Sequence, residues 1–264
     1  MGRRYSRLRA DLNILEICLS SSYRFPLLEG LAFLYLFFPI VFAPLIRAPY
    51  VCQFVSYAFG LPVFLTQILI LVNLAYSVAS EIESGLTQTY ITYPVKRADF
   101  ILIKILVGLG VPITLLALAE AIVTYMAFSV VGFSLDELFF SILASLGQLV
   151  MFALVFLTIS LLIKKGGLAL GISIALWFIL SIAISIFSLF VYFSGIKEFF
   201  YLSALLNPTN IVNAYYAKGS SVLPGGIVVE PTFTEMVLVL LGHYAINIVL
   251  LAIIIAYFMR RFEP

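Results

Sequence analysis

Residues 167–194 read GLALGISIALWFILSIAISIFSLFVYFS and contain no charged side chain. A hydrocarbon core of about 30 Å needs roughly 20 apolar residues in a helix, so this stretch is long enough to cross a membrane. Five further stretches meet the same requirement: residues 27–46, 54–79, 104–130, 138–163 and 237–258. In lipid the backbone must satisfy its own hydrogen bonds, which favours helices. The sequence therefore predicts an all-α integral membrane protein with six transmembrane helices in one domain, residues 1–264.

The composition supports a membrane location. The chain is 63% hydrophobic and 11% charged, whereas soluble domains carry about 25% charged residues. A water-soluble fold could not cover so much apolar surface with charged residues. The exterior of the protein is therefore expected to contact membrane lipid. The net charge of +2 is too small to indicate a nucleic-acid partner.

The positions of Lys and Arg predict the orientation. With the N-terminus placed inside, all of the 15 Lys and Arg residues except Arg47, Lys197 and Lys218 lie in segments on the inner side. Loops rich in Lys and Arg stay in the cytoplasm. We therefore expect a multi-pass protein of the cell membrane with both termini cytoplasmic.

Two segments outside the spans have a mixed polar and apolar pattern. Residues 5–24 alternate basic residues with Leu and Ile, which suits a helix lying on the inner membrane surface; an ordinary polar tail is the alternative. Residues 195–236 are aromatic and too interrupted to span. They predict a re-entrant outer segment with one or two short helices, broken at Asn207-Pro208.

The loop between the second and third spans, residues 80–106, reads SEIESGLTQTYITYPVKRADFILIKIL. Carboxylates suit a helix start, Gly permits a turn, and Pro ends the short helix expected over 86–93. The pattern of acidic residues, Gly, an amphipathic stretch, Pro and basic residues resembles the first cytoplasmic loop of ABC type-2 transporter permease subunits, which are mostly exporters. The matching residues are Glu81, Glu83, Gly85, the stretch 86–93, Pro94, Lys96, Arg97 and Lys104, the last being the Lys that enters the next span in that family.

This resemblance implies a function and partners. Residues 81–97 would be a coupling loop that docks on a separate ABC ATPase subunit, and the permease would form a homodimer or a heterodimer with a related chain. The sequence has no G-x-x-x-x-G-K-[ST] phosphate loop. ATP and magnesium would therefore be held by the ATPase. We expect no cofactor, metal site or catalytic residue in this chain, which would not itself be an enzyme.

Some polar and aromatic residues are candidates for a translocation path or an outer gate. Ionisable residues inside a bilayer are costly and often functional. Glu120 and His243 are expected at similar depth, and Asn247 shares a helix face with His243. They could form a Glu120–His243 pair; alternatively, Glu120 is hydrated and His243 bonds a backbone carbonyl. The other candidates are Phe199, Phe200, Asn207 and Tyr215.

Polar amides within the spans are expected to bond between helices, and Gly167 with Gly171 to form a close helix contact. Three other functions are alternatives: a secondary transporter, a membrane subunit for assembly or anchoring, and a membrane enzyme. A secondary transporter should show internal repeats, which this sequence lacks. The missing motifs argue against an enzyme.

Overall fold

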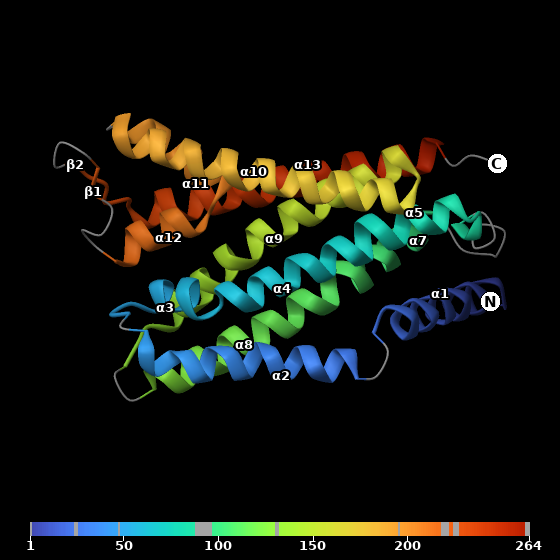
Figure 1. Cartoon of the computed structure of the whole chain (residues 1–264), viewed down its shortest axis with the longest axis horizontal. Coiled ribbons are helices and arrows are strands. Elements are labelled where there is room, and N and C mark those ends of the chain that lie inside the picture. The colour runs from blue at the N-terminus through green and yellow to red at the C-terminus, as the bar shows by residue number, and fades with distance from the viewer. Residues whose placement is uncertain are drawn as a thin grey trace.

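The computed structural model of the chain describes residues 2–23, 26–46, 48–87, 97–129, 132–194, 196–217, 222–223 and 227–261. In this part, six helical segments are long and apolar enough to span a membrane: Leu27–Leu45, Gly60–Glu83, Arg97–Phe128, Leu135–Ile163, Gly166–Val191 and Phe233–Arg260. The prediction of six spans in a multi-pass membrane protein is confirmed. Figure 1 shows the spans side by side, with both chain termini at one end of the bundle. We call this the termini end and the opposite one the distal end.

Several spans contain more than one helical element. The first is α2 (Leu27–Phe42) with the 3₁₀ turn η1 (Ala43–Leu45). The second is α4 (Gly60–Ile70), the π-helix η2 (Leu71–Ser77) and α5 (Val78–Glu83). The third is α7 (Arg97–Ile105), the π-helix η3 (Leu106–Gly110) and α8 (Val111–Phe128). The last three are α9 (Leu135–Ile163), α10 (Gly166–Ser194) and α13 (Phe233–Arg261).

The remaining elements are short or lie beside the spans. Helix α1 (Gly2–Ser22) packs against α7 and η3 at the termini end, whereas α3 (Val51–Ala58) lies at the distal end. Helices α11 (Lys197–Leu206) and α12 (Thr209–Tyr216) are separated at Asn207-Pro208, where the sequence predicted a break. Strands β1 (Val222–Leu223) and β2 (Ile227–Val228) form an antiparallel pair.

The predicted span boundaries differ most from the structure at the starts of the second and third spans. The second span begins at Gly60 rather than 54, because Phe59 leaves helical geometry (φ −99°, ψ 8°) and separates α3 from α4. Pro62 lies in the first turn of α4, where its missing N–H costs nothing. The third span begins at Arg97 rather than 104, and Asp99 in its first turn suits a helix start.

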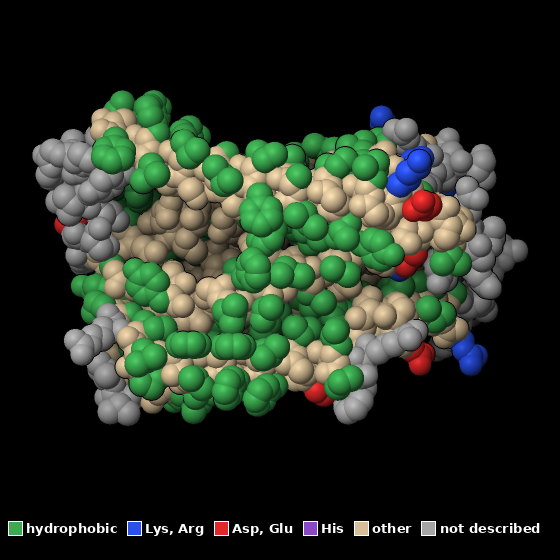
Figure 2. Space-filling model, in the orientation of Figure 1, with side chains coloured by type: hydrophobic (Ala, Val, Ile, Leu, Met, Phe, Trp, Pro, Cys, Tyr) green, Lys and Arg blue, Asp and Glu red, His purple; other side chains and the backbone are tan. Residues whose placement is uncertain are grey.

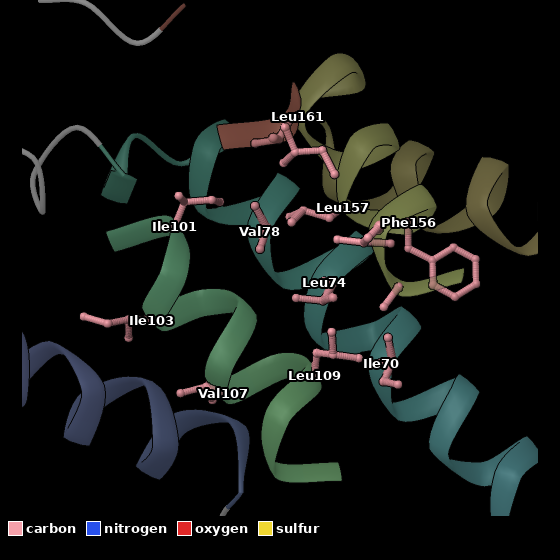
Figure 3. Packing of buried hydrophobic residues seen from close by; sticks show 14 of the residues in the cluster. Ile70, Leu74, Val78, Ile101, Ile103, Val107, Leu109, Phe156, Leu157 and Leu161 are labelled. Carbon is pink, nitrogen blue, oxygen red and sulfur yellow. The ribbon is translucent and has the colours of Figure 1, made fainter. Parts of the chain in front are cut away.

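Helix α9 is the centre of the bundle. Half of its spanning window (50%) is buried, compared with 6% for α10 and 11% for α2, so those two helices present most of their surface outward. Figure 3 shows the packing around α9: Leu157 and Leu161 face Val78 and Leu74 of the second span. These side chains belong to one buried apolar cluster near the termini end.

The two π-helical segments contact each other and are tied to α1. The Tyr23 hydroxyl donates to the carbonyl of Val107 in η3 (2.8 Å) and accepts from the side-chain amide of Asn73 in η2 (3.0 Å). The side-chain amide of Asn73 thus bonds to a residue outside its own span, as expected of polar amides within the spans. A Cβ at Gly108 would lie 2.6 Å from Cδ2 of Leu74, so glycine is what permits this approach.

Replacing Gly108 with Leu should therefore lower the stability of the purified protein. Leu74 is only 1% exposed and cannot move aside freely, and overpacking typically costs about 1–3 kcal/mol. Gly30→Leu is the matched control, because nothing lies within 4 Å of a Cβ at that position. Thermal unfolding should show a lower Tm for Gly108→Leu alone; equal Tm values for the two variants would contradict the close contact.

Candidate functional site

An ion pair joins the second and third spans at the termini end. Nζ of Lys104 in α7 lies 2.5 Å from Oε1 of Glu81 in α5, and the side chains are 9% and 18% exposed, respectively. Lys104 also lies over the ring of Phe100, 5.7 Å from its centre. The pair thus connects α5 and α7, the two helices that flank the segment predicted to contact an ATPase subunit.

The second carboxylate of this region reaches another span. Oε2 of Glu83 accepts a hydrogen bond from the backbone N–H of Gly166 (2.9 Å), the first residue of α10. Glu81 and Glu83 were predicted to lie near a helix start; both belong to α5, and the helix start that Glu83 contacts is that of α10. Glu83 instead stabilises the start of α10, where unpaired N–H groups favour a negative charge.

The chain turns at Gly85, whose φ of +74° lies in the left-handed region that glycine adopts without strain. Leu86 and Thr87 are helical again, as predicted for the start of a short helix. Pro94 and Lys96 lie outside the described residues, and Arg97 begins α7. The coupling role of the segment remains a prediction.

Helix α1 contributes a thiol to the same region. Cys18 is buried beside Lys104. Burial raises the pKa of the Cys18 thiol, and the neighbouring Lys104 lowers that pKa to a smaller extent. The thiol is therefore neutral near pH 7 and packs as an apolar group. Helices α1, α5, α7 and α10 are thus all joined around these contacts.

In the distal half, Glu120 and His243 do not form the pair that was one of the two alternatives from the sequence. Glu120 is 0% exposed, and its Oε1 accepts a hydrogen bond from the hydroxyl of Ser145 in α9 (2.8 Å). The expectation of a hydrated Glu120 was therefore wrong too. The physical reason is that α8 and α13 both pack on α9, so each polar group finds its partner away from the other.

His243 holds three elements together. Its Nδ1 lies 2.8 Å from the carbonyl of Leu205 in α11, which confirms the predicted bond to a backbone carbonyl, and its Nε2 lies 3.1 Å from Nδ2 of Asn247. A Cβ at Gly147 of α9 would lie 2.9 Å from His243 Nε2. Glycine at 147 is therefore required for α9 to approach this histidine.

The candidate gate residues belong to a packed cluster at the distal end. Phe200 is buried. The ring of Phe199 lies tilted against Phe190 of α10, with 5.8 Å between ring centres, and that of Tyr215 lies tilted against Phe233 of α13, with 6.0 Å between centres. Oδ1 of Asn207 accepts a hydrogen bond from the Thr209 hydroxyl (2.5 Å). These contacts hold α11 and α12 against α10 and α13, and a gating role remains a prediction.

Some residues near these sites were missed or misplaced by sequence reasoning. Ser141, Ser145 and Gln148 share one face of α9, and their spacing of four and three residues could have revealed this. The predicted close helix contact at Gly167 and Gly171 is not formed with any residue that the structure describes, because none of them lies within 4 Å of a Cβ at either position.

The ion pair can be tested by a double-mutant cycle. Lys104→Met should destabilise the protein by about 3–5 kcal/mol, because it leaves the carboxylate of Glu81 largely buried without its partner. Adding Glu81→Gln should recover much of this loss. Lys165→Met, at an exposed lysine of the same end, is the control. Thermal or denaturant unfolding gives the coupling energy, and additive losses would show that the two side chains do not interact.

Comparisons with known proteins do not narrow the function. No family model matches the chain, and no curated protein matches it. Among the described residues, no group of three or more His, Cys, Asp or Glu side chains could hold a metal ion. The contacts at the two ends of the bundle are therefore the basis for a functional proposal.

Proposed function

We propose that this chain is the permease subunit of an ATP-driven ABC transporter, an exporter that works with a separate ATPase subunit. The observation that carries the proposal is the ion pair of Glu81 with Lys104. It joins the two spans that flank the segment resembling a coupling loop, and Glu83 adds α10 through Gly166. A force applied to this segment would therefore move three spans rather than bend one loop.

The termini end would face the cytoplasm of the cell, because most Lys and Arg residues of the sequence fall in segments at this end. Helix α1 would lie on the inner membrane surface and α11 with α12 in the outer one. ATP and magnesium would be bound by the ATPase, whose closure and reopening would push and release the coupling segment.

A second copy, or a related permease chain, would complete the translocation path. Helices α10 and α2 are little buried in the single chain. The open faces of Gly167 and Gly171 on α10 would allow close approach of a partner helix. A membrane subunit that only anchors a partner would use the same segment without transporting a substrate. Retention of the ATPase and ATP-driven transport are therefore measured separately.

An affinity-tagged chain purified from its own membrane should retain an ABC ATPase subunit, because the termini end would be its docking surface. Mass spectrometry identifies the retained protein, and transport in reconstituted vesicles shows whether ATP drives it. Retention without ATP-dependent transport would indicate an anchoring subunit. Absence of any ATPase after chemical cross-linking would overturn the proposal.

Gly85→Ala should uncouple ATP hydrolysis from transport. A non-glycine residue in left-handed geometry costs roughly 1–2 kcal/mol, so the turn should shift to another geometry. Gly132 has the same kind of geometry (φ +83°), but it lies between α8 and α9 at the distal end. Gly132→Ala is therefore a control with matched backbone strain. Transport per ATP hydrolysed should fall in Gly85→Ala only, and an equal fall in both variants would contradict a specific coupling role.

A further inference from the structure

A cavity of about 170 Å³ lies in the distal half of the bundle. Figure 2 shows a hollow in the surface here, beside α9 and between α4 and α12. Six hydrogen-bonding side chains line the cavity: Ser56, Ser141, Ser145, Gln148, Thr209 and Asn213. One water needs only about 10–15 Å³ of such volume, so the cavity can hold a polar group of several atoms.

The lining offers hydrogen bonds without charge. The hydroxyl protons of Ser56 and Ser141 are used on backbone carbonyls of Cys52 and Glu137. Thr209 donates to Asn207, within the same segment. Because these protons are already engaged, the hydroxyl oxygens face the cavity as acceptors. The amides of Gln148 and Asn213 add donors and further acceptors.

A buried carboxyl group fixes one wall of the cavity. Ser145 donates to Oε1 of Glu120, which is 0% exposed and whose Oε2 has no hydrogen-bond partner. Ser145 therefore separates the carboxyl group from the cavity. An ion entering the cavity would find no charged lining residue to compensate its desolvation. The chemistry of the cavity favours a neutral ligand with several hydroxyl groups.

Exposed apolar side chains follow three of the lining residues in the sequence of α3 and α4. Tyr57 follows Ser56, Leu61 follows Gly60 and Phe64 follows Val63, and they are 67%, 43% and 43% exposed. A ligand that reaches the hollow from the side would pass these lipid-facing side chains. An apolar tail attached to the polar group could remain against them, which would add hydrophobic contact.

We propose that this cavity binds the uncharged, hydroxyl-rich head of an amphiphile whose apolar tail lies along α4. Hydroxyls of the head donate to the serine and threonine oxygens and accept from Gln148 and Asn213. Binding follows from the cavity alone. That the bound amphiphile is the transported substrate rests on the proposed function.

The test uses the full chain in lipid nanodiscs and hexyl glucoside as the probe. Hexyl phosphate and hexyltrimethylammonium carry the same tail with a charged head. Calorimetry should show saturable binding of the glucoside and binding of the charged probes weaker by about tenfold. Equal affinities for all three probes, or only non-saturable partitioning into lipid, would overturn the proposal.

Variants locate the binding. Gln148→Leu and Asn213→Leu should each weaken glucoside binding by about tenfold, because each loses its hydrogen bonds to the ligand. Gln67→Leu makes the same change on α4 at a residue that does not line the cavity, and should bind as the parent does. Equal loss in Gln67→Leu, or full binding by both cavity variants, would contradict the site.

A labelling experiment decides the matter if the leucine variants fail to fold. In a chain with Cys18 and Cys52 replaced by Ala, Ser56→Cys should react with a water-soluble thiol reagent, and hexyl glucoside should slow the reaction. Ser129→Cys, at an exposed residue that follows α8 and does not line the cavity, should react without protection; equal protection at both positions would refute the site. Retention of an ATPase is measured separately, so failure of the cavity proposal is distinct from failure of the proposed function.

Discussion

A buried charge in a membrane protein must be paired, and in this chain the pairing of Glu81 with Lys104 organises the termini end. The lysine lies in a span and is almost fully buried, so without the carboxylate it would carry an uncompensated charge in an apolar surrounding. The pair fixes α5 against α7, and the bond from Glu83 then fixes α10 against α5. Helix α1 packs on this assembly through Cys18. The position of the turn at Gly85 follows from these contacts, since the chain leaves α5 one turn beyond the pair.

Apolar length was sufficient to predict the six spans, because a hydrophobic segment of about 20 residues has few alternatives to a membrane helix. The break at Asn207-Pro208 was also predictable, because proline restricts its neighbour. The hydrogen-bond partners of the polar residues within the spans could not be predicted in this way. Glu120 accepts a hydrogen bond from Ser145 of α9, whereas His243 bonds to the carbonyl of Leu205 in α11, and only the packing order of the helices decides this.

The two halves of the bundle use polar side chains differently. At the termini end, the paired charges of Glu81 and Lys104 restrict the movement of α5 relative to α7, which suits an element that transmits force. In the distal half, neutral hydroxyl and amide groups line a cavity. The hydroxyls of Ser56 and Ser141 donate hydrogen bonds to backbone carbonyls of their own helices. Such groups tolerate apolar surroundings at lower cost than charges do. They can therefore remain available to a ligand without destabilising the helices that carry them.

The second span is the element that takes part in both regions. Its α5 portion holds Glu81 and Glu83, and its α4 portion contributes Gly60 and Val63 to the cavity wall. Between them lies the π-helix η2, and π-helical turns are places where helices bend and where functional sites often occur. Because η2 packs on η3 through Gly108 and is bonded to Tyr23 of the N-terminal segment, a displacement of α5 would reach this bend together with α7 and α1. If the chain has the proposed function, a force on the segment after α5 would then change the angle of α4, and with it the width of the cavity, without breaking the second span.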